Sequence, residues 1–156
     1  VHYSGTMGAV IEACVNKIPA IGFSLCDHDQ DADFAPMGKY VRELSRAILR
    51  NGLPDYTCLN VNFPKTDKIK GLKVCQQARG HWTNEWEACP RSFDENYYWL
   101  SGGFVPAKKG NEFSDNRALA EGYGAITPTL VDVTDYGYIN EFEKMIAGMT
   151  LEDIDE

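Results

Sequence analysis

Three residues near the start of the chain are of types that could hold an anion. Ser4, Gly5 and Thr6 stand directly ahead of an apolar pattern with helical spacing. Serine is a favoured N-cap residue, and the first backbone N–H groups of a helix have no partner within the helix. These free donors, together with the positive end of the helix dipole, favour a bound phosphate. The simpler interpretation is a helix cap that binds nothing, and the residue types alone favour it.

The apolar residues that follow predict the elements that would position this group. Met7, Ile11 and Cys14 recur on one face of a helix that is expected to end near Asn16. Residues 20–25 are a short apolar run with little alternation, typical of a strand buried on both faces of a parallel sheet. A helix followed closely by such a strand is half of a βαβ unit, so the expected fold class is α/β. No strand precedes the helix, and we therefore expect the chain to enter its protein midway.

Composition and charge argue against several classes of function. The 156 residues carry a net charge of −8, which disfavours binding to nucleic-acid polymers or membrane surfaces, because both need a positive field. The sequence given contains no apolar run of about 18 residues and no signal-peptide pattern, so we expect no membrane association. The five cysteines are scattered without a CxxC pair. This pattern predicts reduced thiols in a cytoplasmic protein rather than a disulfide frame or a zinc site.

An acidic stretch after the first strand resembles a metal loop only superficially. Residues 26–33 read CDHDQDAD, with carboxylates at alternate positions and His28 among them. Counted from Asp27, the sixth position of a calcium-binding EF-hand would need glycine and holds Ala32, and the twelfth would need glutamate and holds Gly38. We therefore interpret the stretch as a solvated loop that leads into the next helix.

Periodic patterns predict the remaining elements. Helical spacing runs from Phe34 to Asn51, and Leu59, Val61 and Phe63 alternate along a strand that ends at Pro64. Further along, we expect strands at 71–78 and 97–100 and a flexible connector at 101–114. A helix at 116–121, capped by Asp115, is followed by a strand at 123–133 that bends or lies at a sheet edge at Pro128. A last helix starts from Thr134, and a frayed tail follows at 151–156.

Aromatic residues gather in the polar stretch between the strands expected at 71–78 and 97–100. His81, Trp82, Trp86 and Phe93 have few apolar neighbours in the sequence that could bury them. Such an excursion is typical of a hairpin that packs against another subunit. A base-stacking groove is the alternative, and the acidic balance weighs against it.

Four segments, taken in order, resemble the SurE family of survival-type acid phosphatases. They are HYSGTMGAVIEA, PAIGFSL, LNVNFP and ALAEGYGAITPT, and the resemblance extends to about Met145. The resemblance implies metal-dependent 5′- or 3′-nucleotidase activity on nucleoside monophosphates. It also implies a Rossmann-like three-layer core, incomplete in this chain, that forms one domain over 1–156. A protruding hairpin arm at 79–100 and a C-terminal helix at 135–149 would serve contacts in a homodimer or homotetramer.

The same resemblance assigns a limited set of site residues. Ser4, Gly5 and Thr6 match the family positions beside the substrate phosphate. The family's ligands for Mg²⁺ or Mn²⁺ precede the segment that matches Val1, so no catalytic or metal residue is expected in this chain, and the chain alone is expected to be inactive. Asn60 and Asn62 match a structural strand and not the metal site. Two alternatives stay open: an oligomerisation fragment, and an α/β domain that binds an anion without catalysis.

Overall fold

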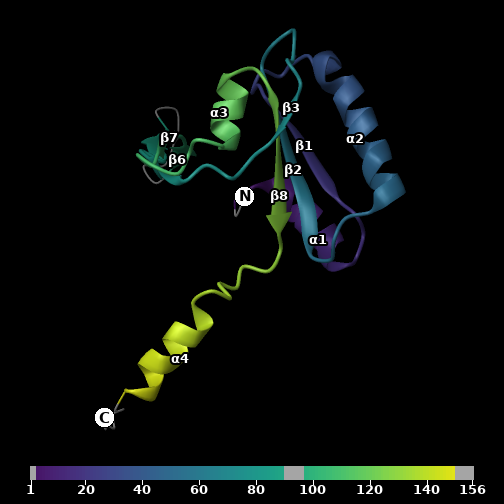
Figure 1. The fold of residues 1–156 in the computed structure, drawn as a ribbon. Helices are drawn as coiled ribbons and strands as arrows, with labels where there is room; N and C mark the ends of the chain where they lie inside the picture. Colours follow the sequence, from purple (N-terminus) through teal and green to yellow (C-terminus); the bar gives the residue numbers. More distant parts are fainter. Residues whose placement is uncertain (1–2, 90–96, 150–156) are drawn as a thin grey trace.

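The computed structural model describes residues 3–89 and 97–149 (Figure 1). In chain order the elements are α1 (Gly5–Val15), β1 (Ile21–Cys26), a 3-10 turn (Ala35–Met37), α2 (Gly38–Asn51), β2 (Thr57–Pro64), β3 (Leu72–Val74), β4 (Gly80–Thr83), β5 (Trp86–Ala88), β6 (Tyr98–Leu100), β7 (Gly103–Pro106), α3 (Asp115–Ala120), β8 (Gly124–Leu130) and α4 (Ile139–Ala147). Within these described ranges no helix is long and apolar enough to cross a membrane.

The central sheet has four strands in the order β1-β2-β8-β3. β1 runs parallel to β2, with Ile21 opposite Leu59. β8 runs antiparallel to β2 and parallel to β3. Helices lie on both sides of this mixed sheet, with α2 and α3 on opposite sides in Figure 1. The α/β, Rossmann-like fold class predicted from the sequence is confirmed.

The side chains of β2 divide the core into two layers. Leu59, Val61 and Phe63 point to one face and pack against residues of α2. Cys58 points to the other face and packs against Met7 and other residues of α1. Since side chains alternate along a strand, Asn60 and Asn62 share the α1 face with Cys58. Ala125 of β8 pairs with Asn62 and packs under α3, so α1 and α3 cover the same face.

Pro128 lies in β8 at a level where one side of the strand lacks a ladder partner, in agreement with the sheet edge or bend expected at this position. It pairs with Leu59 of β2, while the β3 ladder with β8 ends at the Val74–Ile126 pair. The side of β8 away from β2 therefore has no ladder partner from β3 at this level. A residue without an N–H group is tolerated where a strand is locally unpaired on one side.

Several elements differ from their sequence-based predictions, and the last helix begins at Ile139 and not at Thr134. The strand expected over 71–78 is limited to β3, which has three residues. Part of the connector expected at 101–114 forms β7, which pairs with β4. The N-cap of α3 is Ser114, whose hydroxyl accepts a hydrogen bond from Arg117 N, whereas the Asp115 carboxylate accepts one from Ala78 N.

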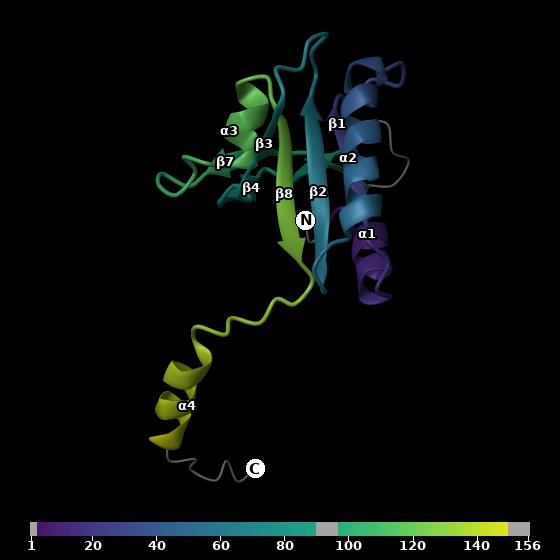
Figure 2. The same ribbon diagram turned by 45° about the vertical axis from the view of Figure 1, so that its right-hand side comes forward.

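Two parts of the chain extend from the sheet. Strands β4 and β7 form one antiparallel ladder, and β5 and β6 form a second one that carries exposed Trp86 and Trp99. Phe93 lies outside the described residues. Helix α4 stands apart from the sheet at the end of an extended segment in both views (Figure 1, Figure 2). Its apolar side chains Phe142, Met145 and Ile146 are about half exposed.

Candidate functional site

The first turn of α1 presents free backbone donors. The Ser4 hydroxyl accepts a hydrogen bond from Met7 N at 3.2 Å, and the Ser4 carbonyl accepts one from Gly8 N at 2.9 Å. The N–H groups of Gly5 and Thr6 donate to no other described residue, and both residues are exposed. Ser4 is therefore an N-cap, as its type predicts, and the two following N–H groups are available to an external acceptor.

Helix α1 directs this turn toward the carboxyl ends of the parallel strands, from the level of Gly22 in β1. A Cβ atom at Gly22 would lie 3.4 Å from Thr6 Cγ2 and 3.0 Å from Met7 Sδ. At the opposite end of the helix, Cys14 packs with Cys58 near the start of β2. The helix thus runs antiparallel to β1 and β2, with its positive end toward their carboxyl ends. In α/β sheets this edge is where ligands ordinarily bind.

Two asparagines of β2 lie next to this turn, on the face of the sheet that α1 covers. Asn60 pairs with Gly22, and Asn62 pairs with Ser24. Asn62 Nδ2 donates to Asn60 Oδ1 at 3.0 Å, and both side chains are half-buried. Thr127, which lies opposite Asn60 on β8, is 5% exposed, and its hydroxyl has no hydrogen-bond partner among the described residues.

The acidic stretch after β1 is organised by its own backbone. Asp27, Asp29 and Asp33 each accept a hydrogen bond from the backbone N–H two residues further on. Asp27 also pairs with Lys65, which follows β2, at 3.0 Å. The hydrogen bond from Lys65 lowers the pKa of Asp27 below its ordinary value. Across residues 3–89 and 97–149 no group of three or more His, Cys, Asp or Glu side chains could hold a metal ion.

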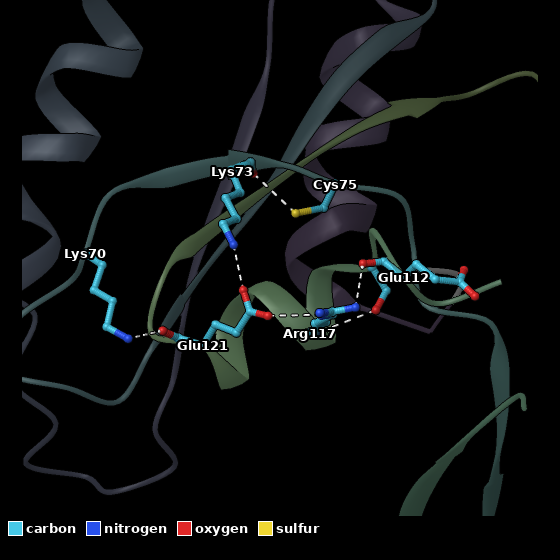
Figure 3. Close-up of polar contacts among 7 residues, drawn as sticks. Lys70, Lys73, Cys75, Glu112, Arg117 and Glu121 are labelled. Carbon is cyan, nitrogen blue, oxygen red and sulfur yellow. Dashed lines mark hydrogen bonds and ion pairs between the residues drawn. The ribbon is translucent and has the colours of Figure 1, made fainter. Parts of the chain in front are cut away.

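A charged cluster on the β3 side of the sheet ties α3 to β3, and Figure 3 shows its contacts. The Glu121 carboxylate pairs with Lys73 Nζ at 2.6 Å and with Arg117 Nε at 3.0 Å. Lys70 Nζ donates to the Glu121 carbonyl at 2.7 Å. The contacts with Lys73 and Arg117 lower the pKa of Glu121, with the Lys73 hydrogen bond as the largest cause. Sequence reasoning missed this cluster, and only the i, i+4 spacing of Arg117 and Glu121 could have indicated part of it.

Comparison with known proteins gives one consistent family. Residues 1–84 match the family model described as "Survival protein SurE". The chain is 60% identical over 141 residues to "5'-nucleotidase SurE" of Bacteroides thetaiotaomicron, covering 90% of this chain and 54% of the relative. It is 57% identical over 144 residues to the Bacteroides fragilis protein of the same name, covering 92% of this chain and 56% of that relative.

A solved structure agrees with this relationship. The crystal structure of the SurE protein from Aquifex aeolicus superimposes with a TM-score of 0.69 at 27% identity, covering 93% of this chain and 58% of that one. The chain spans about half the length of the curated relatives it matches. The family match over residues 1–84, more than half of the chain, shows that this chain belongs to the SurE family.

Proposed function

We propose that this chain is part of a metal-dependent 5′-nucleotidase that hydrolyses nucleoside monophosphates, and that Ser4, Gly5 and Thr6 bind the substrate phosphate. The observation that carries the proposal is the position of the open first turn of α1. Its N–H donors, which have no partner among the described residues, point toward the carboxyl ends of β1 and β2 from the level of Gly22, in a chain whose relatives bear the name 5′-nucleotidase.

The reaction needs a site that stabilises negative charge on phosphate. Water adds to phosphorus, the ester P–O bond breaks, and the leaving nucleoside oxygen takes a proton, which yields nucleoside and inorganic phosphate. The N–H groups of Gly5 and Thr6 would hold non-bridging oxygens during this displacement, and the helix dipole would add to the effect. The N–H groups are fixed by the helix, so they need no reorganisation when the charge shifts.

The proposed activity requires a divalent ion, Mg²⁺ or Mn²⁺, as the family resemblance implies. The acidic side chains that the structure describes near this edge are engaged with the backbone and with Lys65, and they do not fit such an ion. We therefore assign no metal ligand to this chain and derive no step through the metal. We expect the 156 residues alone to lack turnover, because they span about half of each catalytic relative.

Assembly is a second proposed property, favoured by a separate observation. The arm formed by β4 to β7 and the face of α4 expose large aromatic and aliphatic side chains, among them Trp82 and Phe142. We expect them to mediate a homodimer or homotetramer, since large apolar groups on exposed elements mark interaction surfaces. The proposed cellular location is the cytoplasm, with no nucleic-acid polymer as partner.

One assay tests the nucleotidase proposal. Phosphate release from a nucleoside monophosphate is measured with added Mg²⁺ or Mn²⁺ for this chain and for the product of the complete gene. Activity that is confined to the complete product, and that falls on Ser4→Ala or Thr6→Ala substitution, would support the proposal. Full-rate turnover by the 156-residue chain, with contaminating phosphatase excluded by the same variants, would contradict its inactivity. Inactivity of both would favour an anion-binding domain or an assembly role.

A further inference from the structure

A row of polar side chains crosses the sheet on the face that α1 and α3 cover. It consists of Ser24 on β1, Asn60 and Asn62 on β2, and Thr127 on β8. On the opposite face of β2, the apolar side chains of Leu59, Val61 and Phe63 pack under α2. Polar groups in half-buried positions are costly unless they find hydrogen-bond partners, and within the described ranges the Thr127 hydroxyl has none. Packing alone therefore does not explain why this face of the strand is polar.

The geometry of the sheet places Asn62 at the level of the anion that α1 would hold. Thr6 lies over Gly22, which pairs with Asn60. Asn62 is two residues further toward the carboxyl end of β2, a step of about 6.6 Å along the strand. A phosphate on the first turn would lie beyond Thr6 by roughly 3 Å of helix rise and one hydrogen-bond length. The step from Asn60 to Asn62 and the step from Thr6 to the phosphate have the same direction and similar size, so Asn62 lies level with the phosphate.

The amide of Asn62 has the chemistry for such a contact. One N–H of Nδ2 donates to Asn60 Oδ1, which fixes the plane of the amide. A primary amide carries two N–H donors, and the second one of Asn62 meets no acceptor among the residues that the structure describes. A neutral donor held in this way adds a hydrogen bond to an anion without the cost of burying a cation.

We propose that Asn62 binds the substrate phosphate together with Gly5 and Thr6, and that Asn60 is a positioning residue that orients the Asn62 amide. This inference rests on the proposed function, because it assigns a further residue to the same phosphate site. The family resemblance gives the strand segment LNVNFP only a structural role. The proposal assigns this segment a part in binding the phosphate.

The test follows single N–H groups during a titration of the 156-residue chain with inorganic phosphate. In ¹H–¹⁵N spectra, the Asn62 side-chain resonances are expected to shift with the same midpoint as the backbone resonances of Gly5 and Thr6. In Asn60→Ala the shift of the Asn62 side chain should shrink while the backbone shifts remain. A purely structural asparagine would not follow the phosphate concentration.

A variant gives an independent readout. Asn62→Asp keeps the shape of the side chain but replaces the donor with a carboxylate, and we expect it to weaken phosphate binding roughly tenfold or more. Asn51→Asp, at the end of α2, makes the same charge change where Asn51 Nδ2 only donates to Ala47 O, and it should bind like the parent chain. Retained dispersion of the backbone spectrum verifies that each variant is folded.

The outcomes separate this inference from the proposed function. If Gly5 and Thr6 shift while Asn62 does not, or if Asn62→Asp binds as tightly as the parent, the role of Asn62 is refuted and the phosphate site at α1 stands. If none of the three residues responds to phosphate, the site itself is refuted and the inference falls with it.

Discussion

Met7 Sδ lies 3.0 Å from the position that a Cβ atom would take at Gly22, so the first turn of α1 rests directly on the backbone of β1. The side chain of Val10 approaches the same position to 3.2 Å. A side chain at this position would press on Met7, Val10 and Thr6, which would have to give by a few tenths of an ångström. The position of the free N–H donors thus depends on a residue that is not itself part of the candidate phosphate site.

We expect Gly22→Val to lower the free energy of unfolding by about 1–3 kcal/mol, because the added methyl groups overpack a close contact between α1 and β1. Urea unfolding followed by circular dichroism measures the change. Gly8→Ala is the matched control on the same helix, since nothing lies within 4 Å of a Cβ atom there. That substitution should raise the free energy of unfolding by roughly 0.5–1 kcal/mol. Equal stability of Gly22→Val and the parent chain would show that the contact is not tight.

Ser4 allows the cap and the anion site to be tested separately. Ser4→Ala removes the acceptor for Met7 N and should lower the free energy of unfolding by about 1 kcal/mol. Ser4→Asp keeps a good N-cap but places a negative charge beside Gly5 and Thr6. It should retain stability within about 0.5 kcal/mol while weakening phosphate binding. Calorimetric titration with phosphate measures the affinity, and unchanged affinity in Ser4→Asp would argue against an anion at this turn.

Local patterns in the sequence predict much of the core. The alternation of Leu59, Val61 and Phe63 identifies the face that packs under α2, and the spacing of Met7 and Cys14 identifies the buried stripe of α1. These predictions succeed because period-2 and period-3.6 patterns report burial directly. Pairings between distant segments have no such local signature. The glycine-containing stretch at 101–114 therefore indicates a flexible connector, and nothing in it predicts that β7 pairs with β4.

The candidate site, like the fold, could be predicted only where it depends on local sequence. Ser4, Gly5 and Thr6 are recognisable because capping is a local property. The neighbourhood of Asn60 and Asn62 depends instead on the parallel register with β1, which brings together residues almost forty positions apart. The ion pair of Lys73 with Glu121 spans 48 positions and has no sequence signal for the same reason.

The charged cluster around Glu121 predicts a pH-dependent contribution to stability. Lys73 and Arg117 hold the pKa of Glu121 below its ordinary value of 4.5. Because the pKa is lower in the folded chain, the stabilisation is fully present above the unfolded-state pKa and is lost as the pH falls through the folded-state pKa. We expect the parent chain to melt above Glu121→Gln at pH 7, and the difference in Tm to vanish well below pH 4.5.

Glu43 supplies the control for this comparison. It pairs with Arg46 at 2.8 Å, but both side chains are largely exposed, and such pairs contribute at most about 1 kcal/mol. Glu43→Gln should therefore change the Tm little at either pH. A difference between the parent and Glu121→Gln that stays constant from pH 7 to pH 3 would mean that Glu121 acts through packing rather than charge.

The apolar face of α4 predicts that assembly depends on this helix. The ring of Phe142 lies tilted against that of Tyr138 with centroids 6.1 Å apart, and both rings remain about half exposed. If a second copy covers them, Phe142→Glu places a charge in an apolar interface and should shift the mass toward the monomer in light scattering. Glu143→Lys, on the adjacent position of the same helix, changes the charge without altering the apolar face and should leave the mass unchanged. A parent chain that is strictly monomeric at all concentrations would contradict the proposed assembly.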